Sequence, residues 1–175
     1  MTETLTTDRL VLRPFTLDDA ADYWPLVSLP DVLRYTGEQP VESVEKVREL
    51  LRARPLRDYS RHGYGRLACI EKSSGRLIGF SGLKYLEDLD QVDIGYRFLP
   101  ECWGKGYASE SASAAMAYGR HGLGLGRIIG MVMPDNHASA RILVKLGLRY
   151  ESRVSLPGGP ADLDLYAWEI TQAAT

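Results

Sequence analysis

Six residues near the middle of the chain, Trp103-Gly104-Lys105-Gly106-Tyr107-Ala108, combine two glycines, a lysine and the start of a predicted helix. A glycine-bearing turn that leads into a helix leaves several backbone N–H groups free to point in one direction. The helix dipole and the Lys105 ammonium add positive charge at the same place. The segment therefore predicts a binding site for phosphate, although two glycines alone also suit an ordinary tight turn.

A second segment, Asn136-His-Ala-Ser139, predicts a capped helix with polar groups at its start. Asn136 is a good N-cap residue, and Gly147 follows the predicted last residue, Leu146, as at many helix C-termini. Ser139 lies three residues after Asn136 and so on the same side of the helix. Either these two polar groups face a ligand, or the segment is a capped helix with a surface serine.

The histidines and cysteines do not predict a metal site or a covalent catalyst. His62, His121 and His137 lack metal-ligand spacing, and Cys69 and Cys102 make neither a disulfide framework nor a zinc site. Cys102 lies beside the glycine turn, but no histidine or asparagine close in sequence would activate it. We therefore expect Cys102 to be a bystander.

The composition is that of one globular domain over residues 1–175. The chain is 45% hydrophobic and 25% charged, and its formal net charge of -2 argues against a protein that coats nucleic acid. No apolar run is long enough to span a membrane, and the first residues lack the basic and apolar regions of a signal peptide. We therefore expect a reducing, cytoplasmic setting.

The elements that must position these residues alternate between strand and helix, which predicts an α+β domain. The segment from residue 92 to residue 133 forms a strand–helix–strand unit and predicts parallel strands joined by a right-handed crossover. Residues 31–40 are predicted as a loop, and residues 56–63, after Pro55, as a polar, mobile segment. Strands are predicted over residues 9–14, 65–71, 77–85, 91–99, 127–133, 148–154 and 163–170, and helices over residues 16–28, 43–54, 108–121 and 136–146.

The glycine turn resembles the acyl-CoA loop of the GNAT superfamily of N-acetyltransferases, whose pattern is Gln/Arg-x-x-Gly-x-Gly/Ala. Gly106 and Ala108 occupy its last two places, and Trp103 stands where Gln or Arg is commonest. The Trp-Gly-Lys-Gly-Tyr-Ala order is similar to the branch of ribosomal-protein N-terminal acetyltransferases. Asn136-x-x-Ser139, followed by Lys145-Leu-Gly-Leu148, resembles a second family segment, and the order of elements matches over nearly the whole chain.

The resemblance implies a mixed, twisted sheet of six to seven strands, splayed in the middle and flanked by about four helices. It implies acetyl-CoA as co-substrate, with its pantetheine arm on the backbone of Phe98 and Leu99 and near Asn136 and Ser139. A homodimer is compatible with the resemblance. The pyrophosphate would lie on the turn and the helix start, formed by Trp103, Gly104, Lys105, Gly106, Tyr107, Ala108 and Ser109.

For catalysis, the resemblance implies direct transfer to an amine held on the far side of the thioester. Asp93 aligns with a frequent family carboxylate and is a candidate base acting through water; the alternative is a solvated acid at a strand edge. Leu143 stands where many members have an acidic tyrosine, which leaves Ser139 or solvent to protonate the leaving thiolate. Glu110 is explained by the helix dipole alone.

The acceptor implied is a protein N-terminus, such as that of a ribosomal protein, or a small amine. We expect the segments around Tyr35, residues 56–64 and residues 155–160 to select it. A non-catalytic CoA-binding module on the same fold is the alternative. A Rossmann-type dinucleotide site is not expected, because no G-x-G-x-x-G follows an early strand.

Overall fold

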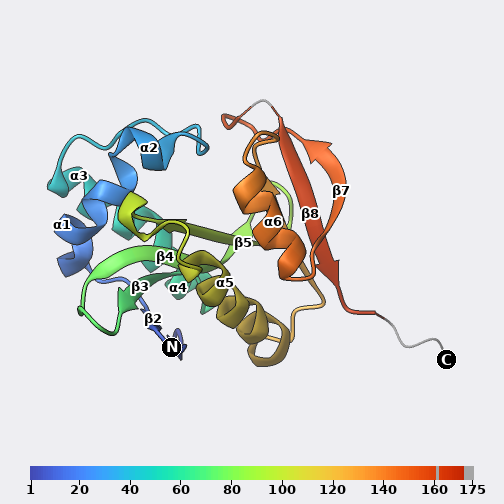
Figure 1. Ribbon diagram of the computed structural model, residues 1–175, viewed down its shortest axis with the longest axis horizontal. Coiled ribbons are helices and arrows are strands. Elements are labelled where there is room, and N and C mark those ends of the chain that lie inside the picture. The colour runs from blue at the N-terminus through green and yellow to red at the C-terminus, as the bar shows by residue number, and fades with distance from the viewer. Residues whose placement is uncertain (161, 172–175) are drawn as a thin grey trace.

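The computed structural model describes residues 1–160 and 162–171, and through them runs one sheet in the order β1-β2-β3-β4-β5-β6-β8-β7 (Figure 1). The α+β class is confirmed, and so is a mixed sheet that splays in the middle. The sheet has eight strands, one more than predicted, because a two-residue strand precedes the first predicted one. The prediction of one domain over residues 1–175 includes residues outside this part of the chain and stays a prediction. The strands are β1 (Leu5–Thr6), β2 (Leu10–Arg13), β3 (Arg66–Glu71), β4 (Leu77–Leu86), β5 (Gln91–Phe98), β6 (Arg127–Val132), β7 (Arg149–Val154) and β8 (Leu163–Glu169).

The sheet splits between β5 and β6. These two strands are parallel, as predicted, and a single residue pair, Asp93 with Ile129, joins them. By contrast, β5 pairs with β4 along its whole length, from Leu86–Gln91 to Gly79–Phe98. In Figure 1, α1–α3 lie on one side of the split and α6, β7 and β8 on the other. The two halves of the sheet therefore diverge from the Asp93–Ile129 pair.

Helices cover both faces of the sheet. Helix α5 (Tyr107–Ala117) packs through Ala112 and Ala115 against Leu83 and Ile94, and its small side chains let it lie close to the strands, as predicted. The opposite face carries Phe80, whose ring meets Tyr23 of α1 edge-on. The remaining helices are α1 (Ala20–Tyr23), α2 (Pro30–Leu33), α3 (Val44–Leu51), α4 (Arg57–His62) and α6 (His137–Lys145).

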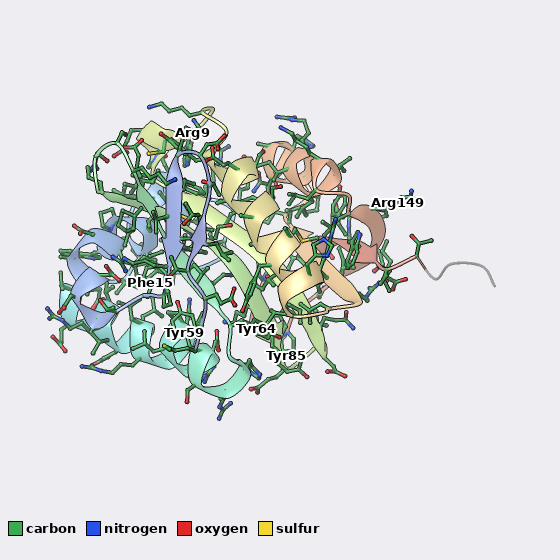
Figure 2. All side chains as sticks on the ribbon, turned by 90° about the horizontal axis from the view of Figure 1, so that it is seen from below. Arg9, Phe15, Tyr59, Tyr64, Tyr85 and Arg149 are labelled. Carbon is green, nitrogen blue, oxygen red and sulfur yellow. The ribbon has the colours of Figure 1, made fainter. Side chains whose placement is uncertain are left out.

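The prediction that the helix ends before Pro55 and is followed by a mobile segment was wrong. Helix α3 begins at the Ser43 N-cap as expected, but the chain continues through a π-helical turn, Arg52–Leu56, into α4. The wider turn accommodates a proline that cannot donate a hydrogen bond. Tyr59 fixes α4 to the sheet, because its hydroxyl accepts from the Phe15 N–H at 3.0 Å and donates to the Arg66 carbonyl (Figure 2). Residues 56–63 are therefore held against the sheet and do not form the predicted mobile segment.

Two other segments also differ from the sequence prediction. Residues 16–28 form a short α1 between two 3₁₀ turns, because Pro25 lies in the second turn. The predicted loop after Pro30 begins instead with α2, which has Pro30 in its first turn, where a missing N–H is tolerated.

Candidate active site

The glycine turn has the geometry of an anion-binding site. Gly104 and Gly106 have φ of +71° and +81°, in the left-handed region that favours glycine. Gly106 is the N-cap of α5, which begins at Tyr107, one residue before its predicted start, and no side chain caps it. The first N–H groups of α5, at Tyr107, Ala108 and Ser109, are therefore available to a ligand, and all three residues line the cavity described below.

Side chains from far along the chain fix this turn. The Trp103 indole Nε1 donates to the Phe98 carbonyl at 2.8 Å, and Arg9 Nη1 donates to the Lys105 carbonyl at 2.9 Å. Arg9 also forms an ion pair with Glu110 at 2.7 Å and lies 4.3 Å from the centre of the Tyr107 ring. The dipole explanation of Glu110 was therefore incomplete. Sequence spacing gave no sign of the contact, because Arg9 and Glu110 are 101 positions apart.

A cavity of about 840 Å³ runs from this turn through the split in the sheet to the opposite face. The Lys105 side chain is exposed and does not line it, although Lys105 belongs to the turn. Leu99 does not line it either: it is buried, and its N–H donates to the Ile78 carbonyl at 2.9 Å. The expectation that Leu99 offers its N–H to a pantetheine arm is thus corrected. The predicted site residues that do line the cavity are Asp93, Phe98, Trp103, Gly104, Gly106, Tyr107, Ala108, Ser109, Asn136 and Ser139.

Strand β5 presents backbone groups to the split. Bonded and non-bonded pairs alternate along an antiparallel ladder, so a bond from Leu99 to Ile78 turns the peptide groups of Phe98 and Tyr96 away from β4. The Phe98 carbonyl is occupied by Trp103, but the Phe98 N–H and the Tyr96 groups face the side that β6 leaves open. This edge can pair with the amides of an extended ligand.

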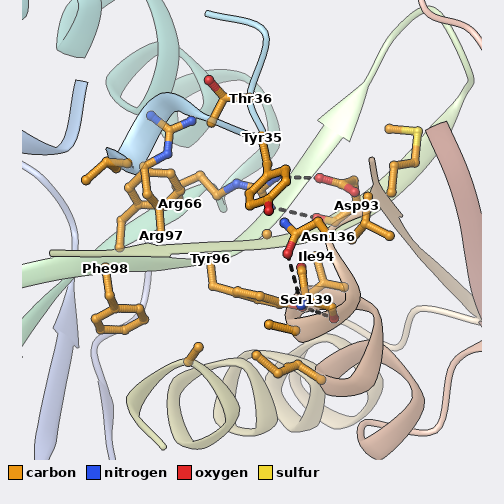
Figure 3. Close-up of a pocket in the computed structure, with 18 of the residues that line it drawn as sticks. Tyr35, Thr36, Arg66, Asp93, Ile94, Tyr96, Arg97, Phe98, Asn136 and Ser139 are labelled. Atoms are coloured by element: carbon orange, nitrogen blue, oxygen red, sulfur yellow. Dashed lines mark hydrogen bonds and ion pairs between the residues drawn. The ribbon is translucent and has the colours of Figure 1, made fainter. Parts of the chain in front are cut away.

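Helix α6 brings Asn136 and Ser139 to the same place, as predicted (Figure 3). The Asn136 Oδ1 accepts from the Ser139 N–H at 3.3 Å, which confirms the N-cap. The Ser139 Oγ lies 3.0 Å from the Tyr96 hydroxyl, which also donates to the Ser139 carbonyl at 2.9 Å. Burial raises the pKa of Tyr96, so its hydroxyl stays protonated at neutral pH. Sequence reasoning missed Tyr96, because its partner lies 43 positions away.

Asp93 lies at the junction of β5 and β6 and is only 7% exposed. The expectation of a solvated acid at a strand edge was therefore wrong. Arg66 reaches Asp93 across the sheet: Nη2 pairs with the carboxylate and Nη1 donates to the Asp93 carbonyl at 2.9 Å (Figure 3). Burial raises the pKa of Asp93, although Arg66 and Lys84 oppose the rise. A carboxylate of raised pKa, held in one orientation, is suited to accept a proton.

The Arg66 side chain crosses the sheet at positions where the neighbouring strands carry glycine. Arg66 stands opposite Gly82 in the β3–β4 ladder, and Gly82 stands opposite Gly95 in the β4–β5 ladder. A Cβ at Gly95 would overlap the Arg66 guanidinium. The absence of a side chain at Gly95 thus leaves the space that the Arg66 guanidinium occupies beside Asp93.

A second charged group lies beside this pair. Glu38 accepts from Arg97 and from Arg54, each at 2.8 Å. Burial alone would raise the pKa of Glu38, but the two guanidinium groups outweigh it, and the pKa is lowered. Tyr35, Leu156 and Pro160, from two of the segments expected to select the acceptor, also line this cavity.

Within the described residues, no cluster of His, Cys, Asp and Glu could hold a metal ion. Cys102 lines the cavity, and burial raises the pKa of its thiol, which disfavours the nucleophilic thiolate. No helix in this part of the chain is long and apolar enough to cross a membrane.

A split sheet with a free helix start on one face and a charged pocket on the other is an arrangement suited to an acyltransferase. Residues 9–149 match the acetyltransferase (GNAT) domain, so the chain belongs to this family. It is 34% identical to the uncharacterized N-acetyltransferase YoaA of Bacillus subtilis, over 93% of this chain and 94% of that protein. It is also 34% identical to the uncharacterized N-acetyltransferase p20 of Bacillus licheniformis, over 85% and 84% of the two chains. The chain is therefore an N-acetyltransferase.

Solved structures share the fold. A GNAT acetyltransferase from Bacillus anthracis has a TM-score of 0.79 and 28% identity, over 95% of this chain and 98% of that one. The ribosomal L7/L12 α-N-protein acetyltransferase RimL, solved in complex with coenzyme A, has a TM-score of 0.77 and 23% identity, over 96% and 98%. At that identity, the likeness to RimL concerns the fold alone.

Proposed function

We propose that this N-acetyltransferase moves the acetyl group of acetyl-CoA directly onto a primary amine, either a peptide N-terminus such as that of a ribosomal protein or a small amine. The observation that carries the proposal is the single cavity that joins the glycine turn to the charged pocket through the split between β5 and β6. Two substrates can meet in such a passage from opposite faces, and holding them together can supply up to roughly 7–11 kcal/mol of the barrier.

Each end of the passage has residues suited to its substrate. The free N–H groups at the start of α5 bind the pyrophosphate, while the open edge of β5 at Phe98 and Tyr96 and the start of α6 hold the pantetheine arm. Acetyl-CoA supplies an activated acetyl group. On the opposite side, Asp93 accepts the proton of the attacking amine, directly or through water. Ser139, hydrogen-bonded to Tyr96, supplies a hydroxyl for the departing thiolate.

The setting and assembly are also part of this proposal. Cys69 and Cys102 are both free thiols, which is typical of a reducing cytoplasm, and we place the reaction there. A homodimer remains an expectation of the family resemblance. The acceptor classes rest on the charged pocket, which suits polar amines, and on the fold shared with ribosomal-protein acetyltransferases.

Release of free CoA thiol, measured with peptides of varied N-termini and with small amines, tests the proposal. We expect thiol release that depends on the amine, with acetylated product confirmed by mass spectrometry. Cys102→Ala should keep most of this activity, because transfer is direct. Binding of acetyl-CoA without release for any amine would support the non-catalytic CoA-binding module instead. An acetyl group trapped on Cys102 would contradict direct transfer.

A further inference from the structure

Several charged side chains on the acceptor side of the cavity are already paired, but two of the less exposed ones are not. Asp93 pairs with Arg66, and Glu38 bridges Arg97 and Arg54. Within the part of the chain that the structure describes, Asp58 and Lys84 line the same space without a hydrogen bond or ion pair, and neither is fully exposed. They have opposite charges but are too far apart to pair directly.

Asp58 projects from α4 into the cavity and is only 5% exposed. Removing a carboxylate from bulk water is costly unless a cation or several hydrogen-bond donors replace the lost hydration. No described side chain forms a hydrogen bond or an ion pair with Asp58, and Asp58 lines the cavity. An acceptor with a positively charged group would satisfy this carboxylate.

Lys84 faces the same space from the sheet. It stands directly opposite Asp93 in the β4–β5 ladder, so both side chains leave the same face. Burial lowers the pKa of Lys84, Arg66 lowers it further, and Asp58 opposes these effects. The Asp93 carboxylate is already paired with Arg66, so Lys84 has no ion-pair partner of its own, and an anionic group placed there would be attracted by Lys84.

We propose that Asp58 and Lys84 form a head-group subsite for a zwitterionic acceptor, with its ammonium at Asp58 and its carboxylate at Lys84. The acceptor is then a free α-amino acid that carries a second amine at the end of its side chain, and this second amine receives the acetyl group. Lys84 lies one strand from Asp93, a spacing of roughly 4.8 Å, which a side chain of four or five carbons can cover. This inference rests on the proposed function, because the other end of the acceptor must be the attacking amine.

Four acceptors with the same five-carbon spacer test the subsite. L-Lysine carries both head-group charges, 1,5-diaminopentane only the ammonium, 6-aminohexanoate only the carboxylate, and 1-pentylamine neither. We expect kcat/KM for L-lysine to exceed that of each singly charged analogue about tenfold or more, with acetylation at the side-chain amine. Equal rates for L-lysine and 1-pentylamine would overturn the proposal, as would a preference for 1,5-diaminopentane over L-lysine.

Two substitutions assign the charges. Asp58→Asn should bring the ratio of L-lysine to 6-aminohexanoate close to one, and Lys84→Met should do the same for L-lysine against 1,5-diaminopentane. A variant that only folds poorly lowers both rates and leaves the ratio at its wild-type value, so unchanged ratios would refute the subsite. Turnover of peptide N-termini but of none of the four probes would refute the subsite and leave the proposed function standing. No thiol release with any amine would refute the proposed function itself.

Discussion

At the scale of single residues, Gly106 joins a backbone requirement to an electrostatic one. Its φ of +81° lies in the left-handed region, and it is the N-cap of α5. Gly106→Asp would place a carboxylate beside the free N–H groups, where the pyrophosphate is proposed to bind. We expect calorimetry to show acetyl-CoA affinity reduced roughly tenfold or more, about 1.4 kcal/mol.

Gly106→Asn is the matched control for this change. Asparagine tolerates the left-handed region about as well as aspartate does, and it has the same size without the charge. Both variants therefore carry the same backbone cost, and the difference between their affinities reports the charge alone. Equal affinities in the two folded variants would show that the turn does not bind the pyrophosphate.

Asp93 gives a prediction about pH. If its carboxylate accepts the amine proton, Asp93→Asn should lower kcat/KM most at low pH, where little of the acceptor is neutral. The gap should narrow as the pH rises toward the pKa of the acceptor, about 7.7–8.0 for an α-amine and about 10.4 for a lysine-like amine. Because burial raises the pKa of Asp93, the wild-type rate should itself fall on the acid side, where the carboxylate becomes protonated.

The control for Asp93→Asn addresses its structural role. Asparagine leaves the buried Arg66 without its charged partner, so the melting temperature and the acetyl-CoA affinity must be measured alongside the rates. A purely structural loss would lower the rate by the same factor at every pH. Parallel rate profiles for the two proteins would therefore rule out the base.

Residues whose signal is local could be predicted from the sequence. The glycine turn, the Asn136 cap and the position of Ser139 follow from neighbouring residues, and the structure has them where they were expected. The partners of the site could not be found in this way. Arg66 and Tyr96 acquire their roles only through strand pairing and the approach of α6, and Asp58 only because the chain forms α4 after Pro55.

At the scale of elements, Gly95 of β5 leaves the space through which Arg66 of β3 reaches Asp93. Gly95→Ala would push the guanidinium away from Asp93 and leave a buried carboxylate without its partner. Removing one partner of a buried pair costs about 3–5 kcal/mol, and side-chain adjustment of Arg66 should reduce this to roughly 1–3 kcal/mol. Urea unfolding should show this loss as a lower midpoint with an unchanged slope.

The same substitution in an Arg66→Met background separates the contact with the Arg66 guanidinium from other effects of the alanine. Without the guanidinium, the added methyl group has nothing to displace, so Gly95→Ala should then cost much less. The difference between the two backgrounds is the coupling energy. Equal losses of unfolding free energy in both backgrounds would contradict this role of Gly95.

The helices show why local rules had limits at this scale. A proline and a polar sequence predicted the end of α3, but the hydrogen bonds of Tyr59 anchor α4 to the sheet. Tertiary contacts outweighed the local signal there. The strands, whose pairing depends on alternation over many residues, followed the sequence more closely.

At the scale of the whole molecule, the split that makes the passage also weakens the sheet. One residue pair joins β5 to β6. A cluster of buried hydrophobic residues that includes Ile94, Ile128 and Leu143 holds the two halves together through α5 and α6. A substrate arm that lies between β5 and α6 would therefore connect two parts that the sheet itself barely connects.

Binding of CoA should change both the global and the local stability of the protein. At a concentration one hundred times its Kd, any ligand specific for the folded state adds about 2.7 kcal/mol, or roughly 5–10 °C in Tm for a chain of this size. ADP has a pyrophosphate but no pantetheine arm, so at the same multiple of its own Kd it should give a similar global shift.

The two ligands should differ in hydrogen exchange. ADP should slow exchange at the start of α5 alone, whereas CoA should also slow it along β5 near Tyr96 and Phe98 and at the start of α6, because its arm would pair with that edge. The Gly106→Asp variant should show both effects reduced at fixed ligand concentration, because its affinity is weaker. Identical protection patterns for ADP and CoA would mean that the arm does not enter the split, and the passage would then have to serve a single substrate.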